Sequence, residues 1–223
     1  MADSGAFAGF PAWGVNFYQE LEDDNTKELW AANKARWERE VREPMLALVD
    51  ELEDEFGPAK LFRPNRDMRF SADKSPYKTH QGAIVGQTAG VGYYVQISGD
   101  GLAVGGGFRT HSPAQTESFR RAIAAAGSGV EFERIVAGLV GAGFDLEGAT
   151  LKTRPKGFVI DHPRLDLLRR KEILAIKRVG TPDWLSKPAA LQHVQAAWRD
   201  IRPLTEWVIA NVPPVTETRG GRA

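Results

Sequence analysis

Residues 83–108 read AIVGQTAGVGYYVQISGDGLAVGGGF and carry the pattern of a β-hairpin. β-Branched and aromatic residues are frequent over 83–86 and 91–97. The turn residues Ser98-Gly99-Asp100-Gly101 follow, and the apolar pattern resumes over 102–108. Because such residues favour strands, and Gly and Asp favour tight turns, we predict antiparallel strands in the middle of the chain.

A long apolar stripe precedes the hairpin and predicts an amphipathic helix. Its residues are three, four or seven positions apart, as one face of a helix requires. They are Trp30, Trp37, Val41, Met45, Leu48, Leu52 and Phe56. We expect Asn25 to cap this helix, with Glu28 completing a capping box. Pro44 predicts a kink or a break near Arg42, because proline removes one helical hydrogen bond.

Helix patterns also follow the hairpin. Ser112-Pro113 is a helix start, and Asp161-His162-Pro163 is expected to open another helix, with Asp161 or His162 as its cap. Residues 173–179 are typical of a strand. A final helix is predicted over 191–208, bent near Pro203.

This order of patterns predicts an α+β fold. Strands cluster in the middle instead of alternating with helices, so we expect a central antiparallel sheet flanked by helices, with a long N-terminal amphipathic helix and a C-terminal helix. We predict a disordered N-terminus over residues 1–6, one α+β domain over 7–212 and a disordered tail over 213–223.

Composition excludes several classes of function. The chain has 223 residues, no cysteine and a formal net charge of zero. Disulfides, thiolate catalysis and cysteine-bound zinc are therefore excluded, and neutrality argues against bulk nucleic acid or an anionic membrane as the main partner. No apolar run approaches ~18 residues, and the N-terminus lacks the basic region of a signal peptide. We expect a cytoplasmic protein without a membrane partner.

The most charged motif lies just before the hairpin. Residues 63–80 read RPNRDMRFSADKSPYKTH, with five lysines and arginines against two aspartates. In an extended segment, Arg66 would share a face with Met68 and Phe70, which should point inward. A cation on a buried face needs a negative partner, and arginine suits two-pronged capture of phosphate or carboxylate. The motif therefore indicates a site for an anion.

The same motif resembles the bacterial domain-of-unknown-function 2461 family. That family has an Arg-x-x-Arg-Asp-x-Arg-Phe run followed by Asp-Lys-x-x-Tyr. The matching residues are Arg63, Arg66, Asp67, Arg69, Phe70, Asp73, Lys74 and Tyr77. The resemblance extends over the full length, including the segment around Trp30 and the run from Pro155 to Pro163. It implies no established activity, cofactor or substrate.

We assign candidate roles on this basis. The predicted ligand-binding residues are Arg66, Asp67, Arg69, Asp73, Lys74 and Lys156. Arg66, Arg69 and Lys74 would hold a small phosphate- or carboxylate-bearing ligand, with help from Lys156. Tyr77, His80 and His162 are candidates for proton transfer, were the protein an enzyme. The sequence decides neither catalysis, nor a cofactor, nor the oligomeric state.

Three alternatives stay open at this point. The cluster also fits a structural ion-pair network with a solvated basic loop, because such networks imitate functional sites. The motif and the basic stretch over 150–178 also fit nucleic-acid binding, though neutrality counts against it. A third alternative is a non-catalytic interaction protein. No pair of the four histidines has the short helical spacing of a zinc motif, so no metal site is predicted.

Overall fold

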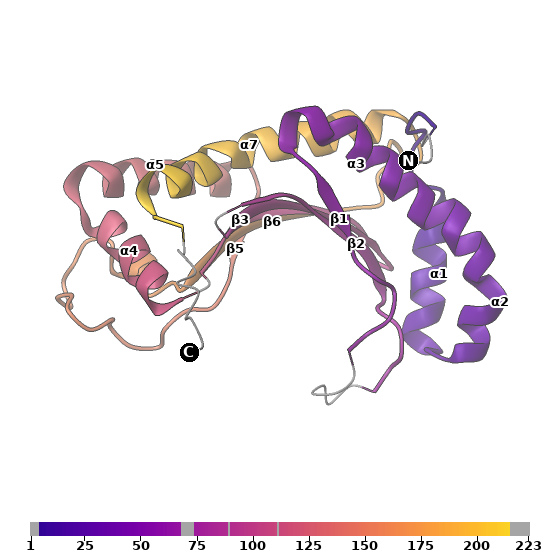
Figure 1. The fold of residues 1–223 in the computed structure, drawn as a ribbon, viewed down its shortest axis with the longest axis horizontal. Helices are drawn as coiled ribbons and strands as arrows, with labels where there is room; N and C mark the ends of the chain where they lie inside the picture. The colour runs from indigo at the N-terminus through magenta and orange to yellow at the C-terminus, as the bar shows by residue number, and fades with distance from the viewer. Residues whose placement is uncertain (1–4, 68–73, 89, 111, 215–223) are drawn as a thin grey trace, which may run out of the picture. The chain divides into compact units, whose positions relative to one another are not determined.

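The computed structural model describes residues 5–67, 74–88, 90–110 and 112–214. It shows an α+β fold built on a six-stranded antiparallel sheet of order β1-β2-β3-β4-β6-β5 (Figure 1). The strands are β1 (Ala59–Leu61), β2 (His80–Thr88), β3 (Val91–Ser98), β4 (Gly101–Arg109), β5 (Asp145–Glu147) and β6 (Glu172–Gly180). The predicted fold class and the predicted hairpin, now β3 and β4, are confirmed.

Helices precede, interrupt and follow the strands, as predicted. They are α1 (Ala12–Asp23), α2 (Lys27–Trp37), the π-helical η1 (Glu38–Arg42), α3 (Glu43–Phe56), α4 (Pro113–Ala124), α5 (Ala126–Gly141), α6 (Leu165–Leu168) and α7 (Ala189–Asn211). α1 and α2 run beside each other, and α3 leads directly into β1 (Figure 1). In the described part of the chain no helix combines the length and the apolar character needed to cross a membrane.

The N-terminal apolar stripe is buried along its whole length. Every one of its side chains is at most 6% exposed, from Trp30 to Phe56. The predicted interruption near Arg42 takes the form of the π-helical η1, which ends immediately before α3 and its Pro44. The helical run continues from α2 through η1 into α3 without an intervening loop, because a π turn is accommodated inside a helix.

The N-cap of α2 differs from the prediction. Thr26 is the cap, and its hydroxyl accepts a hydrogen bond from the Leu29 amide at 3.2 Å. The capping box predicted at Asn25 and Glu28 is therefore wrong by one residue. Both Asn and Thr cap helices well, and Asn25 is used for a different contact.

One glycine of the run 105–107 explains how closely β4 approaches its neighbour β6. Gly107 has φ +143, and a Cβ built there would overlap the main chain of Ile173. The residue must therefore lack a side chain for the two strands to pair.

The chain divides into two compact units, and β2, β3, β4, β6 and α7 each contribute residues to both. Unit 1 comprises Met1–Gln87, Tyr93–Gly105 and Lys177–Arg199, and unit 2 comprises Thr88–Gly92, Gly106–Ile176 and Asp200–Ala223. Aromatic rings fill both cores. Trp198 contacts Phe56 and Tyr93 in unit 1. Phe132 and Trp207 lie 4.3 Å apart, centroid to centroid, in unit 2. One domain over 7–212 stays a prediction.

The helix expected to open at Asp161-His162-Pro163 is only the four-residue α6, and its start was predicted wrongly. Arg164 occupies the N-cap position, and no side chain caps this end. The His162 imidazole instead closes a turn before the helix, with its Nδ1 accepting a hydrogen bond from the Arg164 amide at 3.1 Å. α7 contains Pro203 as predicted. Of the predicted tail, residues 215–223 lie outside the described residues, as do 1–4 of the predicted disordered start.

Candidate functional site

A basic pocket lies in unit 1 where the first two strands meet the charged motif. We call it the β1–β2 pocket. Its volume is about 690 Å³. The lining residues are Lys60, Leu61, Phe62, Arg63, Asn65, Arg66, Asp67, Lys78, Ile84 and Gln87. Among these described residues four carry a positive charge and one carries a negative charge.

Strand register places one wall of the pocket. β1 pairs antiparallel with β2, and Lys60 lies opposite Ile84. Directly paired residues point to the same face of a sheet, so both side chains face the pocket. Their neighbours on β2, Ala83 and Val85, are fully buried on the other face. At Gly86, φ is +61 and a Cβ would overlap the Phe56 carbonyl, so only glycine fits between this wall and α3.

The other wall is an irregular ribbon that continues β1 and β2 beyond the sheet. The Arg66 amide donates to the Pro76 carbonyl at 2.9 Å, and the Lys78 amide donates to the Pro64 carbonyl at 2.8 Å. Asn65 and Tyr77 form an isolated antiparallel bridge between them. Of the extended segment considered around Arg66, the described residues 65–67 form one isolated bridge and no longer strand. This ribbon holds Arg63 and Arg66 near Lys78.

Asn25, between α1 and α2, and Trp30, on α2, anchor the ribbon at Tyr77. The side chain of Asn25 donates to the Tyr77 carbonyl and accepts from its amide, both at 3.0 Å. The Tyr77 ring stacks on Trp30 with 4.4 Å between centroids and 13° between planes. Tyr77 is 9% exposed. Its visible role is to fasten the ribbon to the core, because the described pocket lining does not include it.

Positive charge and burial change the ionisation of two groups beside the pocket. The pKa of Lys78 is lowered by burial, and further by the charges of Arg63 and Arg66. The pKa of His80 is lowered by burial, and further by Lys78 and Arg66. Burial and neighbouring cations both make the protonated, positively charged forms of these two groups less stable. A bound anion would offset the charge of those cations.

Comparison with known proteins gives a family for the chain. A family model described as a conserved hypothetical protein, DUF2461, matches residues 14–207. The chain belongs to the DUF2461 family. The match contains all ten residues that line the β1–β2 pocket. The searches of curated proteins and of solved structures gave no match.

The structure of this DUF2461 protein brings some of the predicted site residues together. Arg66 and Asp67 line the pocket, and Arg66 is half-buried. Met68 and Phe70, with which Arg66 was expected to share an inward face, lie outside the described residues. His80 begins β2 beside them. Lys74 is exposed and is not in the described lining. Arg69 and Asp73 lie outside the described residues.

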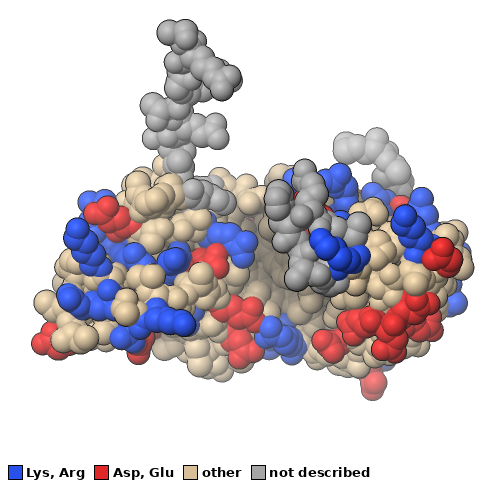
Figure 2. Space-filling model, turned by 90° about the horizontal axis from the view of Figure 1, so that it is seen from below, with Lys and Arg blue, Asp and Glu red and all other residues tan. Residues whose placement is uncertain are grey.

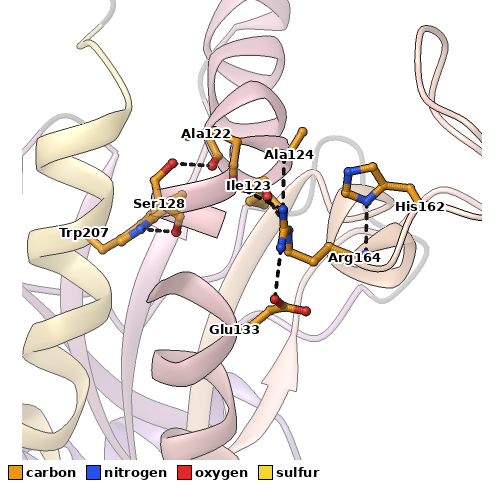
Figure 3. A network of polar contacts seen from close by, with 9 residues as sticks. Ala122, Ile123, Ala124, Ser128, Glu133, His162, Arg164 and Trp207 are labelled. Carbon is orange, nitrogen blue, oxygen red and sulfur yellow. Dashed lines mark hydrogen bonds and ion pairs between the residues drawn. The ribbon is translucent and has the colours of Figure 1, made fainter. Parts of the chain in front are cut away.

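The two remaining predicted residues, Lys156 and His162, belong to unit 2 of the DUF2461 protein. Lys156 is exposed in a loop. His162 lies next to a network centred on Arg164 (Figure 3). The Arg164 guanidinium donates to the carbonyls of Ile123, Ala124 and Ala125, and it contacts Glu133 at 3.2 Å. The contacts recorded for His162 there are therefore structural.

Sequence reasoning missed part of the pocket. Lys60, Phe62 and Gln87 line it, yet none was predicted as a site residue. Lys78 was counted in the charge of the motif but not assigned to binding. Lys60 could have been found only from the register of β1, because the alternation of Ala-Lys-Leu covers three residues, too few to identify a strand from sequence.

Proposed function

We propose that the β1–β2 pocket binds a small anionic ligand that carries a phosphate or a carboxylate. The observation behind the proposal is the charge of its described lining. Lys60, Arg63, Arg66 and Lys78 stand against the single carboxylate of Asp67. This excess belongs to the lining as a whole, so it does not require any one arginine to be unpaired.

The kind of ligand follows from the other lining residues. Leu61, Phe62 and Ile84 add an apolar surface to the cationic one. A volume of about 690 Å³ lies within the usual range of pockets for small molecules. A compact organic anion with an apolar part would use both surfaces, whereas inorganic phosphate would use only the charged one.

Binding through a broad basic surface, as in nucleic-acid recognition, has less support. Figure 2 shows Lys and Arg side chains interspersed with Asp and Glu on the face it displays. A nucleic-acid interface needs a continuous basic stripe that follows the phosphate backbone. A local basic pocket in a neutral chain suits a small anion better.

The proposal predicts that anions raise the melting temperature. A ligand at one hundred times its Kd stabilises the folded state by about 2.7 kcal/mol. For a chain of this size each kcal/mol raises Tm by roughly 2–4 °C, so phosphate or citrate should give a rise of about 5–10 °C. Thermal unfolding at constant ionic strength, set with sodium chloride, measures it.

Two variants and one control assign the effect to the pocket. Arg63→Gln and Arg66→Gln should each remove most of the anion-induced rise, because each deletes a pocket charge. Arg121→Gln is the matched control. It deletes an exposed arginine on α4 whose recorded contact is a hydrogen bond to Ser118. An equal rise in all four proteins, or no rise in the unaltered protein with any anion tested, would contradict the proposal.

A further inference from the structure

Lys78 contacts the pocket ribbon through both its backbone and its side chain. Its amide donates to Pro64 across the ribbon, and the adjacent Tyr77 is fastened to Asn25 and Trp30. Its Nζ donates to the Arg63 carbonyl at 2.7 Å and lies 5.4 Å from the centre of the Phe62 ring. The backbone and the amine of Lys78 are both held before any ligand arrives.

Burial and neighbouring charge increase the share of this amine that is neutral at a given pH. Burial lowers the pKa of Lys78, and the nearby charges of Arg63 and Arg66 lower it further. Only a neutral amine has the lone pair that attacks a carbonyl carbon. Lysines become nucleophiles in this way, through desolvation or through a neighbouring cation. Here both causes act on a residue that lines a pocket.

We propose that Lys78 forms an imine with an anionic ligand that carries an aldehyde or ketone. This inference rests on the proposed function, because Arg63, Arg66 and Lys60 would hold the anionic group while the carbonyl meets the amine. It narrows the ligand to a small oxo acid or a phosphorylated carbonyl compound.

The chemical step balances without a further reactant. The neutral Nζ attacks the carbonyl carbon, a C–N bond forms, and a proton passes from nitrogen to oxygen to give a carbinolamine. Protonation of that hydroxyl by solvent then releases one water and leaves a protonated imine. The positive charge of the imine stays on the former Nζ, beside the anionic group of the ligand.

Lys60 provides an internal comparison. It lines the same pocket from β1, so an aldehyde held there could reach either amine. Burial and the two arginines act on Lys78, and the amine of Lys78 is oriented by the Arg63 carbonyl. If a place in the pocket were enough for reaction, an aldehyde would label both lysines. If the proposed environment of the amine is needed, the aldehyde labels mainly Lys78.

Trapping with borohydride tests the inference. The full-length protein is treated with a limiting amount of pyridoxal 5′-phosphate or glyoxylate, reduced with borohydride, digested and mapped by mass spectrometry. We expect the reduced adduct mainly on Lys78. Lys78→Arg should lose this adduct, Lys60→Arg should keep it, and excess phosphate should suppress it. Arg63→Gln should move the pH at which Lys78 is labelled at half its maximal rate upward, because a cation that lowers its pKa is gone.

The outcomes separate this inference from the proposed function. If phosphate raises the melting temperature but the adduct falls on Lys60, or evenly over many lysines, the imine is ruled out and anion binding stands. If Lys78 is labelled selectively but phosphate neither protects it nor raises Tm, anion binding fails, and the inference fails with it. Labelling of Lys78 that is unchanged in urea-unfolded protein would also overturn it.

Discussion

At the scale of single residues, Arg164 shows how one buried cation can hold a loop. Its side chain is 10% exposed, and its guanidinium satisfies carbonyls at the end of α4 while meeting Glu133 on α5 (Figure 3). Gly129 permits this approach, because a Cβ there would overlap both the Ile123 carbonyl and the guanidinium. The last carbonyls of a helix lack helical partners, so an arginine supplies the missing donors.

We expect Arg164→Ala to destabilise the protein by about 1.5–3 kcal/mol, the range for hydrogen bonds to a charged group. Arg164→Lys should recover only part of this, since an ammonium cannot reproduce the fork of donors. Urea unfolding measures both. Arg121→Ala, an exposed position on the same α4, is the control. A loss for Arg164→Ala no larger than that of the control would show that the network contributes little.

At the scale of elements, the α1–α2 connection and the pocket ribbon depend on each other. Asn25 forms two hydrogen bonds to the Tyr77 main chain from a position between the helices. Its loss leaves a backbone donor and a backbone acceptor to find other partners. Removing one member of a part-buried hydrogen-bonded set costs about 1–3 kcal/mol.

Asn25→Ala should therefore lower stability by that amount and weaken the anion-induced rise in Tm, because the ribbon that carries Arg66 and Lys78 loses an anchor. Asn33→Ala is a suitable control, since the recorded bond of Asn33 is to the Leu29 carbonyl within α2. Denaturant unfolding and anion titration are the measurements. Equal behaviour of the two variants would mean that Asn25 does not support the pocket.

At the scale of the whole molecule, five elements contribute residues to both compact units. They are β2, of which only Thr88 lies in unit 2, and β3, β4, β6 and α7. A strand or helix melts most readily as a continuous hydrogen-bonded element. A boundary inside five such elements therefore favours a single unfolding transition over two, which is the behaviour expected of one domain.

Tryptophan positions make this testable. Trp207 is the one tryptophan of unit 2, and the other five lie in unit 1. The fluorescence of a Trp207→Phe variant reports unit 1, and the difference between the fluorescence of the unaltered protein and that of the variant reports Trp207 in unit 2. We expect both signals and circular dichroism to give the same unfolding midpoint. Calorimetric and van't Hoff enthalpies should also agree. Separate midpoints for the two units would overturn the prediction of one domain.

The sequence by itself determined the main elements, the long N-terminal helical stripe and the central hairpin. The stripe from Trp30 to Phe56 is buried throughout, and the turn at Ser98–Gly101 joins two strands. These patterns are local, because 3.6-residue and two-residue periods and turn chemistry act within a few residues. The positive character of the motif was also readable, since charge depends on composition alone.

Only the tertiary structure decided which residues line the β1–β2 pocket and which residues anchor it. Lys60 lines the pocket because β1 pairs with β2. Asn25, which was expected to cap α2, instead forms hydrogen bonds with Tyr77, 52 residues away. Both contacts join segments that are distant in the chain, and neither changes the local pattern of either segment. Local sequence patterns predict secondary structure, whereas the pocket is formed by contacts between segments that are distant in the chain.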